Sequence, residues 1–293
     1  MRLVANIPLN TPPELQKLAA EVLTAVGRCR FVSTGSLMAF AGPHGLSLDV
    51  LDAWVHVGLL SRGRVCPDPL RPQEIEYVAL TTVGARALHS TVGTKVDGIA
   101  PARLRRSSQK RAHDVFVGEV ALAAMALARD GAIELVGVET DDRKLANVVH
   151  LFAVGQEPER IVLQPDAMLV TEGAIGKEAL LVEVDRGTTA PKRMGVRYRG
   201  YLHWQRDGGP FKAFGIKALR VLTLVPSEPR LEQLHAAAFE ANDSQRSGFL
   251  VFGLQDSASV CTAERLLDPI WRQLGSEPTA RSRCLSPRAL LSA

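Results

Sequence analysis

The sequence predicts a two-domain protein of the α/β (α+β) class. At 293 residues the chain is long enough for two hydrophobic cores. A segment from Ser90 to Ala112, rich in Gly, Ser, Thr, Pro and basic residues, lacks periodicity and separates two differently patterned regions. We therefore expect a first domain at 1–90, a basic linker at 91–112, a second domain at 113–275 and a flexible tail at 276–293.

The overall composition is typical of a soluble globular protein, with 46% hydrophobic residues, 23% charged residues and a net charge of +4. No apolar run is long enough to span a bilayer, and the N-terminal residues lack a signal-peptide core. We expect a cytoplasmic protein without a membrane partner. The four cysteines are scattered without a C-x-x-C pair, which predicts neither a zinc site nor a disulfide framework.

The first ninety residues predict a winged helix-turn-helix domain. Prolines open the first helix, Thr34 and Ser47 are candidate N-caps, and a Pro-rich loop separates two short apolar runs. Three helices, a β-wing and a closing helix define this domain type. The predicted elements are helices Pro12–Val26, Thr34–Gly42 and Leu48–Val57, strands Leu59–Val65 and Glu76–Leu80, and a helix from Thr81.

The helix expected to enter a DNA groove, Leu48–Val57, contains Asp49 and Asp52 but neither Lys nor Arg. Side chains that read base edges are usually Arg, Lys, Asn or Gln. Any DNA contact by this domain is therefore expected from basic residues of the wing and linker. These are Arg62, Arg64, Arg71, Arg103, Arg105, Arg106, Lys110 and Arg111. The alternative is that the winged helix dimerises, giving a homodimer.

The second domain predicts a mixed sheet covered by helices on both faces. Its first helix is apolar almost all round, and Glu119 is the one ionisable residue between the terminal Asp114 and Arg129. A charge at such a position needs a partner or a function. The predicted elements are helix Asp114–Arg129, strand Ile133–Val138, a hairpin of strands Ala167–Val170 and Ala179–Val184, helix Ala190–Arg206, strand Arg220–Val225, helix Glu228–Asn242, strand Phe249–Leu254 and helix Ala263–Leu274.

The hairpin carries the most informative residues. If Val170 pairs with Ala179, Asp166 lies opposite Glu183, and period-two alternation places Asp185 on the same face. Opposed like charges destabilise a strand pair, so a metal cation, basic side chains or a shared proton must compensate. Mg²⁺ suits a site made of oxygen ligands. In the alternative, these are ordinary exposed acids, or the register slips by one residue.

The helix after the hairpin forms a second basic segment. Lys192, Arg193 and Arg197 are interleaved with aromatic residues, as expected of a surface that attracts phosphates and exposed bases. The alternative is an amphipathic helix whose aromatic side chains face the core.

The order α-β-β-β-α-β, with Pro165-Asp166 and then Glu183-Val184-Asp185, resembles the PD-(D/E)XK nuclease fold. The resemblance implies that Asp166, Glu183 and Asp185 bind Mg²⁺, which activates water for phosphodiester cleavage. It also implies a helper role for Glu119. The family's Lys position is Asp185 here, so Lys192 is the candidate that supplies the amine.

From about Arg30 to Leu234, the chain also resembles the replication-relaxation family of plasmid and mobile-element proteins. The motifs that carry the resemblance are R-F-V-S-T-G-S-L, G-L-L-S-R-G, Y-V-A-L-T-T-V-G-A-R-A-L, H-D-V-F-V-G-E-V, Q-P-D-A-M-L-V and L-V-E-V-D-R-G-T. The resemblance implies a DNA-binding protein of replication, relaxation or mobilisation, with DNA and replication or mobilisation proteins as partners. Two hypotheses follow: a Mg²⁺-dependent endodeoxyribonuclease, or a non-enzymatic DNA-binding or protein-interaction module, such as a transcriptional regulator or accessory factor, with a degenerate nuclease fold.

Overall fold

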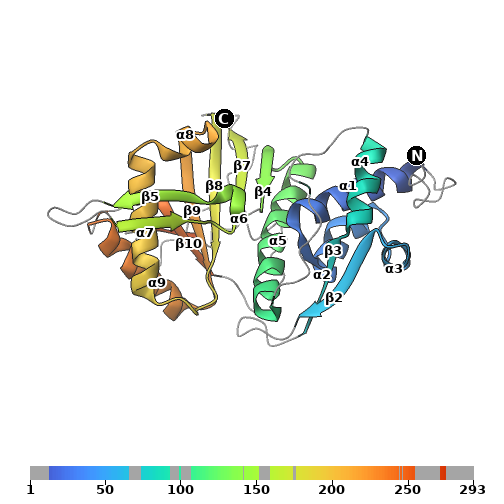
Figure 1. Cartoon of the computed structure of the whole chain (residues 1–293), viewed down its shortest axis with the longest axis horizontal. Coiled ribbons are helices and arrows are strands. Elements are labelled where there is room, and N and C mark those ends of the chain that lie inside the picture. The colour runs from blue at the N-terminus through green and yellow to red at the C-terminus, as the bar shows by residue number, and fades with distance from the viewer. Residues whose placement is uncertain are drawn as a thin grey trace. The chain divides into compact units, whose positions relative to one another are not determined.

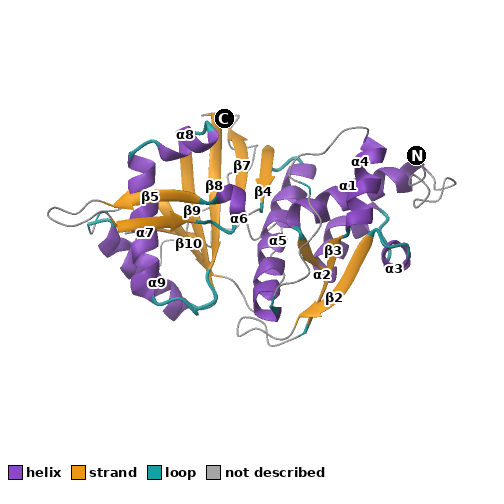
Figure 2. Cartoon of the chain, in the orientation of Figure 1, coloured by secondary structure: helices purple, strands orange, loops and turns teal. Residues whose placement is uncertain are grey.

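The computed structural model describes the chain in several stretches. They are residues 13–65, 74–92, 99, 107–140, 142–151, 159–173, 176–243, 245, 247–254 and 271–274. The described chain forms two compact units, of which the first extends through Ala126 and the second begins at Leu127. Both combine helices with strands (Figures 1 and 2), which confirms the mixed α+β class.

The first unit has the predicted order of helices and strands, with one further short strand. Ser47 caps α3 as predicted, its hydroxyl accepting the Val50 N–H, whereas Ser33 rather than Thr34 caps α2. The sheet order is β1-β3-β2, with antiparallel pairing throughout. The elements are α1 Pro13–Cys29, β1 Phe31–Ser33, α2 Thr34–Ala41, the short 3-10 helix η2 Gly42–His44, α3 Leu48–His56, β2 Leu60–Val65, β3 Ile75–Leu80, α4 Thr82–Val92 and α5 Ser108–Arg129.

Helix α5 packs on the first unit through most of its length. Ala112 and Val115 join the core around Phe31 and Tyr77. A Cβ at Gly118 would lie 1.8 Å from the Phe31 carbonyl oxygen, so the close approach of helix and strand requires glycine. These contacts place the division between the units after Ala126, later than the expected start of the second domain at residue 113.

The second unit contains a six-stranded mixed sheet of order β11-β10-β9-β8-β7-β4. Strands β8, β9 and β10 are parallel, while β4, β7 and β8 form an antiparallel meander. The expected order α-β-β-β-α-β is present as α5-β4-β7-β8-α7-β9, with a β5–β6 ribbon inserted before β7. The elements are β4 Leu135–Glu139, α6 Asp142–Leu145, β5 Asn147–Leu151, β6 Glu159–Leu163, β7 Ala167–Gly173, β8 Gly176–Val184, α7 Pro191–Arg206, α8 Gly209–Phe214, β9 Ala218–Val225, α9 Glu228–Ala241, β10 Ser247–Leu254 and β11 Trp271–Leu274.

The prediction of a helix at 263–274 is wrong for its last four residues. Trp271–Leu274 forms strand β11, which pairs antiparallel with β10 and buries Arg272 and Leu274. Tertiary pairing overrides local propensity at this edge of the sheet. Residues 263–270 and the predicted tail at 276–293 lie outside the described residues, as does most of the predicted linker.

Helix α7 is enclosed on three sides. Its underside rests on the sheet, where the Tyr198 hydroxyl donates to Thr223 of β9 at 3.3 Å. Helix α9 runs along one flank (Figure 1), and a Cβ at Gly195 would lie 3.2 Å from the Ala237 carbonyl oxygen. The β5–β6 ribbon covers the other flank, where Gly200 faces Leu163. One face of α7 therefore remains for solvent.

Candidate functional site

The hairpin has the predicted register. Val170 pairs with Ala179 and Ala167 with Val182, and the Asp166 N–H donates to the Val182 carbonyl oxygen at 2.9 Å. Asp166 therefore continues the ladder opposite Glu183, on the face of the sheet that α7 covers.

Glu183 is 2% exposed and is neutralised from above by α7. One carboxylate oxygen accepts a hydrogen bond from Arg197 Nη1 at 2.7 Å, and the other accepts one from the Tyr201 hydroxyl. The charge of Glu183 raises the pKa of Arg197. Burial, and then the charge of Glu183, raises the pKa of Tyr201 well above its usual value. The charge of Asp166 raises both pKa values further.

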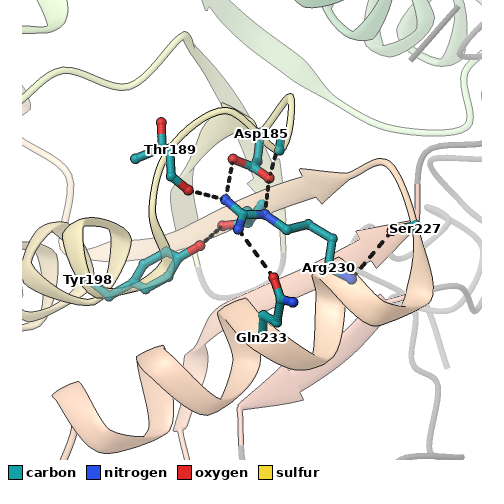
Figure 3. Close-up of polar contacts among 8 residues, drawn as sticks. Asp185, Thr189, Tyr198, Ser227, Arg230 and Gln233 are labelled. Carbon is teal, nitrogen blue, oxygen red and sulfur yellow. Dashed lines mark hydrogen bonds and ion pairs between the residues drawn. The ribbon is translucent and has the colours of Figure 1, made fainter. Parts of the chain in front are cut away.

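Asp185 is held by a guanidinium group from α9. Arg230 donates from Nε at 2.7 Å and from Nη2 at 3.0 Å to the two carboxylate oxygens (Figure 3). The same guanidinium donates to the Thr189 carbonyl oxygen and, at 3.4 Å, to Gln233 Oε1. Ser227 caps the first turn of α9 and so positions Arg230. This network connects the loop between β8 and α7 to the start of α9.

The acids of the hairpin do not fit a magnesium centre in this arrangement. Asp185 and Glu183 are bound by guanidinium groups, which would repel a divalent cation placed beside them. Asp166 Oδ2 accepts the Val184 N–H at 2.8 Å. Within the described stretches, no group of three His, Cys, Asp or Glu side chains could hold a metal ion. Basic side chains therefore compensate the charges of Glu183 and Asp185, and the Mg²⁺ site stays a prediction.

The two remaining candidates for catalysis lie on helices α5 and α7. Glu119 is fully buried on α5 in the first unit, where it accepts a hydrogen bond from the Ser36 hydroxyl at 3.1 Å. Lys192 is exposed in the first turn of α7. Their catalytic roles stay predictions.

The wing arginines are paired with acids of their own unit. Arg62 contacts Asp52 of α3 and, at 3.3 Å, Glu76 of β3. Arg64 lies 3.6 Å from Glu74. Their positive charges are therefore compensated locally.

The linker residues proposed for DNA contact are only partly described. Arg111 donates to the Tyr77 hydroxyl at 2.9 Å, with its guanidinium 5.8 Å from the centre of that ring. Lys110 is exposed at the start of α5. Arg71, Arg103, Arg105 and Arg106 lie outside the described residues.

Helix α7 presents a different kind of surface. Lys192, Arg193, Arg199 and Arg206 are exposed, and we call them the basic stripe. The helix has no acidic residue. Among the described residues, Lys192, Arg193 and Arg199 have no acidic partner, and Arg206 donates to the neutral amide oxygen of Asn242. No carboxylate of the described residues forms an ion pair with the basic stripe, although Asp207, which follows the helix, lies 3.3 Å from His203 Nε2.

The aromatic residues of α7 face the core, as the alternative interpretation predicted. Tyr198 and Tyr201 are fully buried, and Trp204 is 8% exposed. Arg197, predicted to contact DNA, forms an ion pair with Glu183. Arg230 was not among the predicted site residues. It lies 45 positions after Asp185, so no local pattern indicates the pair.

Comparison with known proteins identified one family. A family model described as Replication-relaxation matches residues 23–214, which is well over half of the chain. No curated protein and no solved structure gave a significant match. Within the described part of the chain, no helix is both long and apolar enough to cross a membrane.

Proposed function

This chain belongs to the replication-relaxation family, and we propose that it is a DNA-binding protein that contacts DNA through the basic stripe of α7. Family membership supports a role in the replication or relaxation of a plasmid or mobile element, with DNA or replication proteins as partners. The observation that carries the proposal is the exposed face of α7, where four basic residues stand on a helix without an acid. Clustered, uncompensated positive charge is the electrostatic footprint of a phosphate-binding surface.

The first unit contributes less to this proposal than its element order suggests. The order α1-α2-α3-β2-β3-α4 supports the winged-helix assignment. However, α3 exposes Asp49 and Asp52, and Arg62 is already paired with acids. Acids beside phosphates are unfavourable, so we assign the principal DNA contact to α7.

The chain from α5 to β9 resembles a metal-dependent nuclease in its element order and in the three acids of the hairpin, Asp166, Glu183 and Asp185. We propose that these acids serve as internal counter-ions that seat α7 and α9 on the sheet, and that the protein binds DNA without cleaving it. The alternative is a Mg²⁺-dependent endonuclease. It is favoured by one observation: the register of the hairpin places Asp166 opposite Glu183, on the same face of the sheet.

Fluorescence anisotropy with labelled DNA tests the binding site. Replacing both Lys192 and Arg199 with Gln should lower the affinity on the order of tenfold at moderate salt, since each lost phosphate contact removes counter-ion release. The matched control replaces Lys17 and Lys177, which are exposed on α1 and β8, and removes the same charge. An equal loss of DNA affinity in both variants would mean that net charge alone explains the effect. That result would contradict the assignment of the contact to α7.

Incubation with supercoiled plasmid tests the catalytic alternative. We expect the same topoisomer pattern with Mg²⁺, with Mn²⁺ and with a chelator, and no heat of Mg²⁺ binding by calorimetry. Nicked or linear product that requires metal and disappears in Asp166→Ala would establish the endonuclease instead.

A further inference from the structure

We infer that the basic stripe binds duplex DNA through contacts with its phosphates, without reading base sequence and without stacking on unpaired bases. This inference rests on the proposed function and specifies its substrate. Three features of α7 carry it: the burial of its aromatic rings, the enclosure of its flanks, and the spacing of its basic residues.

Binding of single strands depends on aromatic side chains on which successive bases stack. In the amino-acid sequence, α7 has the required composition, since three aromatic residues alternate with basic ones. In the structure, Tyr198 and Tyr201 are inaccessible and bonded to the sheet, and Trp204 packs edge-to-face on Phe214. The solvent face of α7 therefore offers charge without a stacking platform.

Phe211 of α8 is the large aromatic residue that is exposed in the described part of the chain, at 54%. The Lys217 ammonium lies 5.7 Å from the centre of its ring, within the range of a cation–π contact. One ring already in contact with a cation does not provide the series of rings that a single strand requires.

Enclosure of the flanks prevents α7 from acting as a recognition helix. A helix with its side chains is about 10–12 Å wide and the major groove about 12 Å wide, so only a helix with free flanks can enter it. On one flank Gly195 contacts α9, and on the other Gly200 contacts the β5–β6 ribbon. Only the ends of the basic side chains reach outward, which suits contact with the phosphate backbone rather than with base edges.

The spacing of the stripe suits a rigid, regular polyanion. Lys192, Arg199 and Arg206 recur every seven residues, which places them on one face about 10 Å apart and spans about 21 Å in all. That length corresponds to roughly six base pairs of duplex rise. The helix is anchored from below by the Arg197–Glu183 pair, so the backbone positions that carry these charges form a fixed array. A fixed array complements the regular phosphates of a duplex better than a flexible strand.

Anisotropy titrations with three probes test the inference: a duplex of roughly 24 base pairs, four times the length of the stripe, a duplex of scrambled sequence, and an oligo-dT strand of equal length. We expect the two duplexes to bind within about twofold of each other and the single strand on the order of tenfold more weakly. In the Lys192→Gln, Arg199→Gln variant, the slope of log affinity against log salt should fall by about two. Phe211→Leu, which removes only the ring, should leave every affinity unchanged.

Each other outcome has a defined meaning. Tighter binding of oligo-dT, together with a loss in Phe211→Leu, would overturn the inference and leave DNA binding intact. A strong preference for one duplex sequence would also overturn it. Failure to bind any of the three probes would remove the proposed function itself.

Discussion

Helices α3 and α7 are both surface helices, but α3 exposes acidic side chains to solvent and α7 exposes basic ones. Helix α3 stands where a winged helix carries its recognition helix, yet it buries only Leu51 and exposes Leu48, Asp49 and Asp52. Helix α7 lies in the second unit and buries seven residues. Its exposed side chains are all basic, and the others are partly buried. The position of a helix in a familiar motif therefore does not assign its function. The charge of its exposed face and its packing on the rest of the unit constrain that function.

The same distinction separates the arginines of the two regions. Arg62 and Arg64 are compensated by acids of their own unit. Arg197 and Arg230 form ion pairs with the buried carboxylates of Glu183 and Asp185. The stripe differs because its charge has no anionic partner within the described residues. Three measurements probe how firmly α7 and α9 are held on the sheet, and a fourth compares the basic residues of α7 with those of β2.

The largest effect is expected from Asp185→Ala, which leaves the guanidinium of Arg230 buried without its carboxylate. The side chains of Asp185 and Arg230 are 3% and 9% exposed. Breaking a buried pair in this way costs about 3–5 kcal/mol. Urea unfolding should show that loss of stability. The double variant Asp185→Leu, Arg230→Met should lose less, because no charge remains buried. A loss below about 1 kcal/mol in Asp185→Ala would show that the pair does not anchor α9.

A smaller effect is expected at alkaline pH, from the two tyrosines beneath α7. Burial raises the pKa of Tyr198 and of Tyr201 above the ordinary value of 10.0, and the charge of Glu183 raises both further. A raised folded pKa contributes stability that is complete below pH 10 and is lost as the pH rises above it. Each tyrosine should remove about 1.4 kcal/mol per pH unit there.

Unfolding free energies measured across this range should therefore fall less steeply in Tyr201→Phe than in the wild type. Equal slopes in the two proteins would mean that Tyr201 is not held neutral under α7.

The smallest effect is expected at acidic pH, from His235 on α9. Burial lowers its pKa from the ordinary 6.5, and the charge of Arg272 lowers it further. A histidine with a lowered folded pKa is neutral in the fold, so stability falls as the pH drops below 6.5 and the unfolded chain takes up the proton. We expect a loss of about 1 kcal/mol toward pH 5 that is absent in His235→Gln. An identical acid profile in the variant would contradict this.

Local patterns in the sequence predicted much of the fold, because periodicity reports which face of an element is buried. The hairpin register that pairs Val170 with Ala179 followed from the position of the Gly-containing turn between the two apolar runs and is confirmed. The Ser47 cap of α3 followed from its side-chain chemistry and is confirmed as well. Strand β11 was missed because pairing with β10, rather than its own pattern, determines its conformation.

The site was less predictable than the fold, since its partners are distant in the chain. The position of Asp166 opposite Glu183 could be predicted from spacing. Whether a metal cation, basic side chains or a shared proton compensates the acids could not be predicted from the sequence, because Arg230 lies on another helix. Similarly, composition showed that α7 mixes aromatic and basic residues, but only packing shows that the rings face inward and the charges outward.

The central claim is that DNA contacts α7 rather than the wing beside α3. Salt titrations of duplex affinity for two charge-matched variants, one with Gln at Lys192 and Arg199 and one with Gln at Arg62 and Arg64, test it most directly. We expect the α7 variant to lose affinity on the order of tenfold with a slope reduced by about two, and the wing variant to stay within about twofold of the wild type. The reverse pattern, with the loss confined to the wing variant, would contradict the account.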